Sequence, residues 1–79
     1  MTNVYDDIKA ERERQDKLWG GAAHDDDHTD TDWASFIGKR SDELLMRSQT
    51  DSRTRELFLH IAALAVAAIE SMDRTKEQR

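Results

Sequence analysis

Three segments of the chain carry apolar side chains at the spacing of a helix. In residues 3–19 and 29–48 the apolar positions recur every three or four residues, which is typical of helices with one buried face. In residues 57–69 the sequence LFLHIAALAVAAI is apolar on every side except at His60. With no proline and only three glycines, the chain has few helix breakers. The pattern therefore predicts an all-α fold, in which a three-helix chain forms a helical bundle as a single domain over residues 1–79.

The polar residues between these segments carry helix start and stop signals. Gly20 and the glycine after it end the first helix, because glycine adopts the left-handed conformation at little cost. Thr29, with Asp32 three residues further on, approximates a capping box and predicts the start of the second helix. Either Asp51 or Ser52 can cap the third helix after a short polar turn. The segment between the first and second helices is therefore expected to be a loop.

The third helix is more apolar than its neighbours in the chain can cover. A helix that is apolar on every side is buried on every side, whereas two partner helices in so short a chain cover about half of its surface. Its alanines, such as Ala62 and Ala65, would let another helix backbone approach closely. We therefore expect the bundle to be completed by oligomerisation through the third helix, which makes the protein a homo-oligomer.

Composition and charge exclude several classes of protein. Seventeen acidic side chains against twelve basic ones give a formal net charge of −5, and the bases are interleaved with the acids. A direct nucleic-acid binder would show a basic surplus on one face, so this role is not expected. The longest apolar run is too short to span a bilayer, and no N-terminal run resembles a signal peptide. Because the chain also lacks cysteine, the sequence predicts a soluble cytoplasmic protein with no membrane partner.

The densest polar cluster is HDDDH, at residues 24–28. Carboxylates suit hard cations such as magnesium, and histidine suits zinc or manganese, so the mixture selects no single metal. Histidines four residues apart would need a helix to act together, whereas the glycine pair upstream and Thr29 downstream bracket the segment as a loop. We therefore predict a solvated loop in which His24 is available to a ligand, and a metal site is the alternative.

Aromatic and cationic side chains lie on both sides of this cluster in the sequence. Trp19 and Trp33 could sandwich a nucleobase, because an aromatic face stacks on any base; the alternative is that both belong to the core. Any two cations that converge on the loop would form a phosphate clamp; the alternative is a set of solvated helix faces. The cations in question are Arg12, Arg14, Lys17, Lys39 and Arg40.

The chain also carries a longer signature. It begins with ERERQDKLWG at residues 11–20, continues with His24 and Trp33, and ends with AALAVAAIESMDR at residues 62–74. This signature resembles the short phage and prophage proteins described as MazG-like, which carry ER-x-RQD-x-x-WG near the start and an alanine-rich helix ending in IES-x-DR. The resemblance covers nearly the whole chain, and the group is distantly similar to all-α nucleoside triphosphate pyrophosphohydrolases.

True MazG-type enzymes bind magnesium with E-x-x-E on one helix and E-x-x-D on the next. By the resemblance, these two motifs fall where this chain has Lys39, Arg40, Asp42 and Glu43, and then Glu56 and Leu59. Only Glu43 and Glu56 match the metal ligands, and two carboxylates of four would hold a divalent ion poorly and leave the attacking water unactivated. The resemblance thus implies a degenerate metal site with magnesium as the candidate cofactor, and no catalytic residue is assigned.

Together these observations predict a small helical protein of phage type that binds a nucleotide-like ligand more readily than it hydrolyses one. One alternative is a phage accessory protein that inhibits a host defence, either by binding a host protein or by sequestering a signalling nucleotide. Another alternative is a magnesium-dependent nucleoside triphosphate pyrophosphohydrolase with a rearranged site. The residues predicted to bind the ligand are Arg12, Arg14, Trp19, His24, Trp33, Lys39 and Arg40.

Overall fold

The fold is built from helices. The computed structural model describes residues 3–46 and 50–77, and within these ranges it contains no strand. The helices are α1 (Val4–Trp19), α2 (Gly21–Asp25), α3 (Asp30–Met46) and α4 (Asp51–Glu77). The predicted all-α class is confirmed. The prediction of three helices is wrong, because residues 21–25 form a further short helix where a loop was expected.

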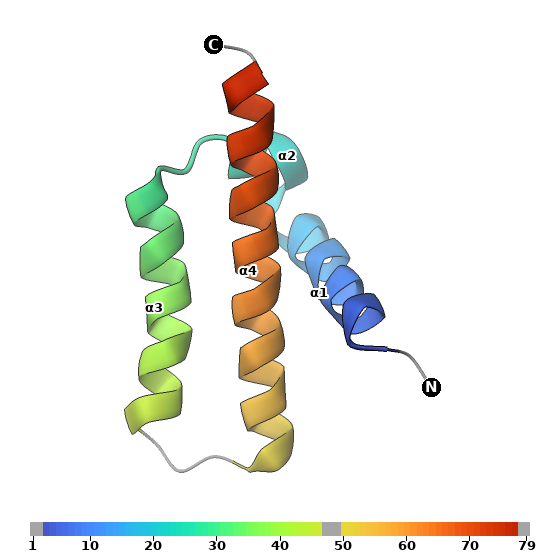
Figure 1. Ribbon diagram of the computed structural model, residues 1–79, viewed down its shortest axis with the longest axis vertical. Helices are drawn as coiled ribbons and strands as arrows, with labels where there is room; N and C mark the ends of the chain where they lie inside the picture. Colours follow the sequence, from blue (N-terminus) through green and yellow to red (C-terminus); the bar gives the residue numbers. More distant parts are fainter. Residues whose placement is uncertain (1–2, 47–49, 78–79) are drawn as a thin grey trace.

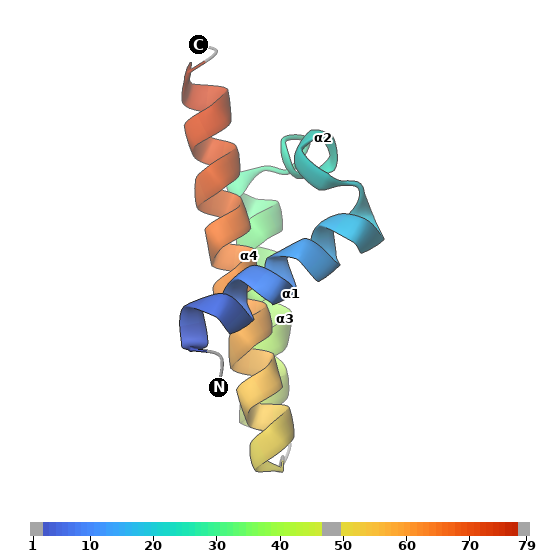
Figure 2. The same ribbon diagram turned by 90° about the vertical axis from the view of Figure 1, so that its right-hand side faces the viewer.

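The longest helix, α4, is the one against which the other three pack. α3 runs antiparallel beside it, and α1 crosses it obliquely on its other side (Figures 1 and 2). α2 lies beside the C-terminal half of α4, between the end of α1 and the start of α3. The arrangement therefore gathers three segments around one end of α4: the end of α1, the whole of α2 and the start of α3.

The predicted signals at Gly20 and Thr29 are confirmed. Gly20 has a φ of +100°, in the left-handed region, and its N–H donates to the Asp16 carbonyl at 2.9 Å to end α1. At the start of α3, the Thr29 hydroxyl accepts the Asp32 N–H at 3.1 Å, and the Asp32 carboxylate accepts the Thr29 N–H at 2.9 Å. These reciprocal bonds form the expected capping box. The bond from the Thr29 backbone also lowers the pKa of Asp32.

The start of α4 differs from the prediction. The helix begins at Asp51, and the hydroxyl of Thr50 accepts a hydrogen bond from the Arg53 N–H at 3.2 Å. Thr50 is therefore the cap, and the predicted cap at Asp51 or Ser52 is wrong by one or two positions. Asp51 instead lies in the first turn, where a negative charge interacts favourably with the free N–H groups of the helix.

The apolar core lies between α3 and α4. Trp33 of α3 is buried together with Leu64 and Ala67 of α4, and Phe36 and Ile37 pack against this group. The one residue of α1 that is fully buried is polar, Gln15, which donates to the Glu11 carboxylate at 3.0 Å. α1 is thus held against α4 with less apolar burial than α3, and polar contacts carry more of its attachment.

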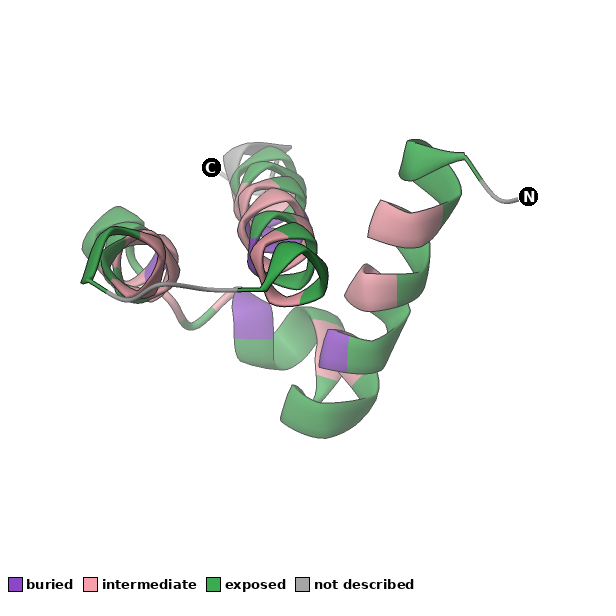
Figure 3. Cartoon of the chain, turned by 90° about the horizontal axis from the view of Figure 1, so that it is seen from below, coloured by how far each residue is buried: buried purple, intermediate pink, exposed green. Residues whose placement is uncertain are grey.

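The outer side of α4 remains uncovered. Leu57, Ala63 and Leu64 face the bundle and are buried, whereas Phe58 and Ile69 are each 58% exposed. Figure 3 shows α4 between α3 and α1, with exposed residues along its length. The expectation that the chain covers only part of this helix is confirmed, and oligomerisation stays a prediction. No helix in the described ranges combines the length and apolar character needed to cross a bilayer.

Candidate functional site

A pocket of about 280 Å³ opens where the end of α1, α2 and the first turns of α3 meet above α4. Its floor is apolar and includes Phe36 and Leu64, which also belong to the core or pack against it. Its rim carries two imidazoles, a carboxylate and two cations. The lining residues are Trp19, His24, Asp25, His28, Trp33, Phe36, Lys39, Arg40 and Leu64. Five of the seven residues predicted to bind a ligand therefore lie around one pocket.

His28 is the centre of an aromatic cluster on one wall. Its ring centroid lies 4.6 Å from that of His24, 5.1 Å from Trp33 and 5.0 Å from Phe36, and each pair meets nearly at right angles. Such edge-to-face contacts fix the orientation of the rings. Trp33 is 6% exposed, so it serves the core and the pocket together, whereas Trp19 is 41% exposed at the rim. The core interpretation is confirmed for Trp33, and the stacking interpretation stays a prediction for Trp19.

The two histidines meet because the segment predicted to be a loop is coiled. α2 runs to Asp25, and the following turn continues with the Asp26 N–H donating to the Ala22 carbonyl at 2.9 Å and the His28 N–H to the Asp25 carbonyl at 3.1 Å. This geometry keeps residues 24 and 28 on the same side of the segment. The prediction of a solvated loop is wrong here, since Asp25 is 5% exposed and the Asp26 side chain is bound to α4.

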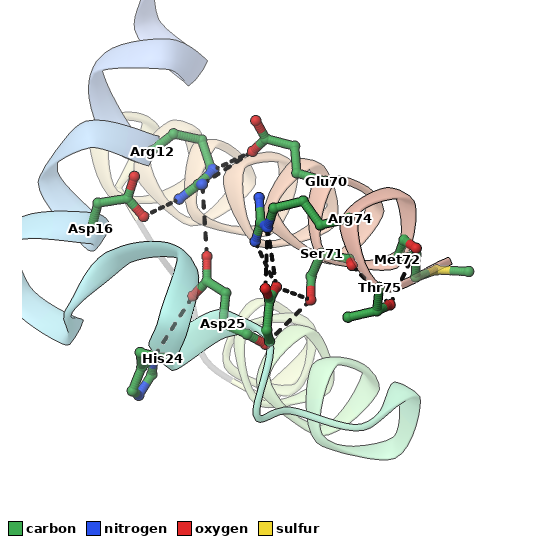
Figure 4. A network of polar contacts seen from close by, with 10 residues as sticks. Arg12, Asp16, His24, Asp25, Glu70, Ser71, Met72, Arg74 and Thr75 are labelled. Carbon is green, nitrogen blue, oxygen red and sulfur yellow. Dashed lines mark hydrogen bonds and ion pairs between the residues drawn. The ribbon is translucent and has the colours of Figure 1, made fainter. Parts of the chain in front are cut away.

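Asp25 links the pocket to the interior. Its Oδ1 lies 3.6 Å from Nδ1 of His24, and its buried Oδ2 has no hydrogen-bond partner but lies 3.7 Å from Nη2 of Arg12 (Figure 4). A buried carboxylate is costly unless a cation compensates its charge. Arg12 supplies that positive charge. Its guanidinium also binds the carboxylates of Asp16 at 2.9 Å and Glu70 at 3.0 Å. Arg12 thus connects α1, α2 and α4 behind the pocket and does not line it.

A second polar tie holds the turn after α2 against α4. The Asp26 carboxylate accepts hydrogen bonds from Arg74 at 2.8 Å and from the Ser71 hydroxyl at 2.9 Å. The hydrogen bonds from Arg74, and then the one from Ser71, lower the pKa of Asp26. Glu70, Ser71 and Arg74 belong to the IES-x-DR end of the signature, and Arg12 belongs to its ER start. These signature residues therefore build the frame of the pocket.

Lys39 and Arg40 are the cations at the pocket rim. Both follow Phe36 by about one helical turn and Trp33 by about two, which brings them to the face of α3 that borders the pocket. Within the part of the chain that the structure describes, neither has an ion-pair partner. Two cations without a protein partner beside aromatic walls make a local positive region in a chain of net negative charge.

The remaining predicted cations lie elsewhere. Arg14 makes two hydrogen bonds of 2.7 Å to the Glu11 carboxylate on its own helix, and these bonds lower the pKa of Glu11. Lys17 is exposed and does not line the pocket. A ligand role of Arg12 or Arg14 would therefore require each to leave carboxylates that it already binds. Three residues that line the pocket were not predicted to do so from sequence spacing: Asp25, His28 and Phe36. A helical register for residues 24–28 would have identified the first two.

The carboxylates that the resemblance assigned to a metal share an arginine. Nη2 of Arg53 lies 3.2 Å from both oxygens of Glu43, and its Nη1 lies 3.1 Å from Glu56. Across residues 3–46 and 50–77 no group of three or more histidine or acidic side chains converges as a metal site. A guanidinium that neutralises both carboxylates, with no third ligand, does not fit magnesium. The metal role of Glu43 and Glu56 stays a prediction from the resemblance alone.

His60 of α4 lies at the contact between α1 and α4. Its Nε2 is 3.6 Å from Glu11 of α1 and 3.8 Å from Glu56 of its own helix. The imidazole is half-buried and joins α1 to α4 at a distance from the pocket. It acts as a packing residue of the α1–α4 contact.

Comparisons of the chain with protein-family models, with curated proteins and with solved structures find no match. The resemblance to MazG-like proteins therefore stays an expectation from the signature residues.

Proposed function

We propose that the pocket binds a small anionic ligand with a planar ring, of the nucleotide class. The observation that carries the proposal is the convergence of Trp19, His24, Lys39 and Arg40 around one cavity with Trp33 in its wall. These residues come from three helices and were each selected on chemical grounds. A planar ring stacks on an aromatic face, and Arg and Lys bind phosphate oxygens through charge-assisted hydrogen bonds.

The size of the cavity supports a small ligand. Pockets for small molecules usually enclose roughly 300–1,000 Å³, and this cavity, at about 280 Å³, lies at the lower end. One ring with a short phosphate chain suits that volume better than a dinucleotide. The imidazoles of His24 and His28 would then flank the ligand as hydrogen-bonding groups.

The carboxylates of this chain favour binding of the nucleotide without hydrolysis. Phosphoryl-bond cleavage in all-α pyrophosphohydrolases depends on magnesium, and Glu43 and Glu56 share the Arg53 guanidinium instead. We therefore expect purified protein to release no pyrophosphate from nucleoside triphosphates. Magnesium-dependent release that disappears in Glu43→Gln would contradict this expectation and favour the enzyme with a rearranged site.

Sequestration of a signalling nucleotide would use the same pocket. The resemblance to phage proteins makes inhibition of a host defence the biological role that we would test next. In that role the ligand would be a regulatory nucleotide, and a host protein would be the alternative partner. If no nucleotide binds and the protein captures a purified host defence protein, inhibition by binding a host protein would be favoured.

We expect the protein to self-associate through the outer face of α4, which we define as Phe58, Ala62, Ala65, Val66, Ile69 and Met72. Four of these side chains are large apolar groups that the chain leaves in water. Burial of apolar surface contributes roughly 25 cal/mol per Å² removed from water. The self-association is independent of the ligand pocket, because none of the residues of this face lines the pocket.

The ligand proposal can be tested by thermal shift and calorimetric titration with nucleoside mono-, di- and triphosphates, with and without magnesium. A ligand at 100 times its dissociation constant should stabilise the protein by about 2.7 kcal/mol. Lys39→Gln with Arg40→Gln should weaken binding at least about tenfold, or 1.4 kcal/mol, through loss of phosphate contacts. Lys17→Gln is the matched control, because this lysine is exposed outside the pocket. Equal weakening by the control would contradict the assigned site.

A second variant tests the ring contact. Trp19 is exposed at the rim, so Trp19→Ala should leave the melting temperature of the free protein nearly unchanged while the loss of stacking weakens the ligand by about 1–3 kcal/mol. Inorganic triphosphate, which has no ring, should bind wild type and Trp19→Ala equally. A variant that binds nucleotides like the wild type would remove stacking from the proposal and leave only the anion site.

A further inference from the structure

The carboxylate of Asp25 receives no hydrogen bond from the described residues, 3–46 and 50–77. Its Oδ1 lies 3.6 Å from Nδ1 of His24 and its Oδ2 lies 3.7 Å from Nη2 of Arg12, and both distances are too long for a hydrogen bond. Asp25 is only 5% exposed, and it lines the pocket. A buried carboxylate without donors is costly, because it has lost its hydration and gained no hydrogen bond in exchange. The pocket therefore contains an acceptor that a ligand could satisfy.

Arg12 determines which oxygen of Asp25 a ligand can meet. Figure 4 shows one carboxylate oxygen directed at Arg12 and the other at His24. Oδ2, on the Arg12 side, is buried, and Arg12 itself does not line the pocket, whereas His24 does. The guanidinium is held in this position because it also binds Asp16 and Glu70. Oδ1 is therefore the oxygen that faces the cavity.

The charges that line the pocket come from different helices. The carboxylate belongs to Asp25 of α2, and the two cations are Lys39 and Arg40 of α3. A phosphate beside Asp25 would face a charge of its own sign, so the phosphate of a nucleotide belongs beside the cations. The ring edge is then the part of the ligand that meets Asp25, while the face of the ring can stack on Trp19.

Guanine is the nucleobase whose edge suits a carboxylate best. Its N1–H and its 2-amino group are adjacent donors. Adenine and cytosine place an unprotonated ring nitrogen beside their amino group, and uracil flanks its N–H with carbonyl oxygens. In those bases a lone pair would face the negative charge of Asp25. The carboxylate thus attracts guanine through charge-assisted hydrogen bonds and disfavours the other bases by repulsion.

We infer that the pocket is specific for a guanine nucleotide, whose N1–H and 2-amino group donate to the carboxylate of Asp25. This inference rests on the proposed nucleotide pocket and adds the identity of the base. Asp25 contacts the base and not the phosphate, so it determines which nucleotide binds. A site built to receive a donor discriminates strongly against a ligand that lacks it, because the buried acceptor is then left unpaired.

The wild-type protein can test the base preference by calorimetric titration with the diphosphates of guanosine, inosine and adenosine. Inosine lacks the 2-amino group, and adenosine lacks both donors while it keeps the same ribose and phosphates. Each lost hydrogen bond to the carboxylate should weaken binding about tenfold or more, so affinity should fall from guanosine through inosine to adenosine. Equal affinity for the three would overturn the inference and leave the nucleotide pocket standing. If none of them binds, the proposed function fails and the inference fails with it.

Asp25→Asn should transfer the preference to a different base. Because Arg12 is a donor, the new amide would turn its carbonyl toward Arg12 and its NH2 group toward the pocket. Xanthine carries a carbonyl where guanine has the 2-amino group. The variant should therefore bind xanthosine diphosphate at least about tenfold more tightly than the wild type does, and guanosine diphosphate more weakly. Structural damage would not produce such a gain of affinity.

Asp27→Asn is the matched control, because Asp27 is exposed and does not line the pocket. It should keep the wild-type preference, and circular dichroism should show that both variants retain their helices. If Asp25→Asn binds all nucleotides more weakly and gains nothing for xanthosine diphosphate, Asp25 is a residue of the frame alone and the inference is overturned. The series with wild-type protein decides the question if Asp25→Asn does not fold.

Discussion

The two contacts that α4 makes with its long neighbours differ in kind. α3 packs against α4 through uncharged side chains, with Trp33 of α3 against Leu64 and Ala67 of α4. α1 and α2 are held by Arg12, Asp25 and their carboxylate or guanidinium partners. Apolar packing is non-directional and changes little with pH or salt, whereas ion pairs depend on both. The same helix thus has one contact that sets the stability of the fold and another that can be loosened selectively.

The difference matters for the pocket, because it lies between the two regions. Trp33, Phe36 and Leu64 of the apolar region form its floor, and Trp19, His24 and Asp25 of the polar region form its rim. A fixed floor with a rim that depends on charged contacts would allow a ligand to order the rim. The following experiments disturb one region at a time.

The largest effect is expected from the apolar region. Leu64→Ala removes a buried side chain at the centre of the α3–α4 core and should lower the free energy of unfolding by about 2–5 kcal/mol. For a chain of this size such a loss can unfold the protein at room temperature. Urea denaturation followed by circular dichroism measures it. Phe58→Ala, at an exposed position on the same helix, is the control; a comparable loss there would show that the outer face is packed in solution.

The polar region should respond next, and more locally. Arg12→Met keeps the length of the side chain but leaves the buried Asp25 carboxylate without its nearby cation, which should cost about 1–3 kcal/mol. Amide exchange should accelerate in α1 and α2 while α3 and the facing part of α4 stay protected. Arg14→Met removes an ion pair within α1 whose arginine is half exposed, and should change stability by less than about 1 kcal/mol. Uniform acceleration in all four helices would show that the two regions unfold together.

Acid should weaken the polar region before the apolar region, through protonation of Asp26. The hydrogen bonds from Arg74 and Ser71 hold its pKa below the ordinary value, so folding is favoured by the charged form. That contribution is fully present above about pH 4 and is lost as the pH falls through the lower pKa of the folded state. Amide exchange of residues 21–28 should therefore accelerate, relative to α3, as the pH falls below about 4. Asp26→Asn should flatten this dependence, and an unchanged profile in that variant would assign it to other carboxylates.

The smallest effect is expected at the arginine shared by Glu43 and Glu56. Arg53→Gln removes partly exposed ion pairs, so the loss of stability should stay below about 1 kcal/mol. The variant also frees the two carboxylates, which lets the predicted metal role be tested directly. We expect no stabilisation by magnesium in the wild type. Stabilisation of the wild type by millimolar magnesium that is absent in Glu43→Gln would reinstate the metal site.

Local signals in the sequence determined the class of fold and several helix ends. Gly20 and the Thr29–Asp32 box act within four residues of themselves, so their effect does not depend on the rest of the molecule. The chemistry of the pocket could also be selected from residue type, because stacking and phosphate binding require aromatic rings and cations. Trp19, His24, Lys39 and Arg40 were predicted in this way and lie together.

The tertiary structure decided what these local signals leave open. Three adjacent acids favour water and so predict a loop over residues 24–28, yet Asp25 is buried where Arg12 can compensate its charge, and Asp26 is bound where Arg74 reaches it. Residue type predicts Arg12 as a ligand group on the same grounds as Lys39, but the carboxylates of Asp16, Asp25 and Glu70, from three helices, make it a structural residue. A side chain's residue type sets which interactions it can make. Which partner it meets depends on contacts between helices that lie up to 58 residues apart in the chain, and no local periodicity encodes them.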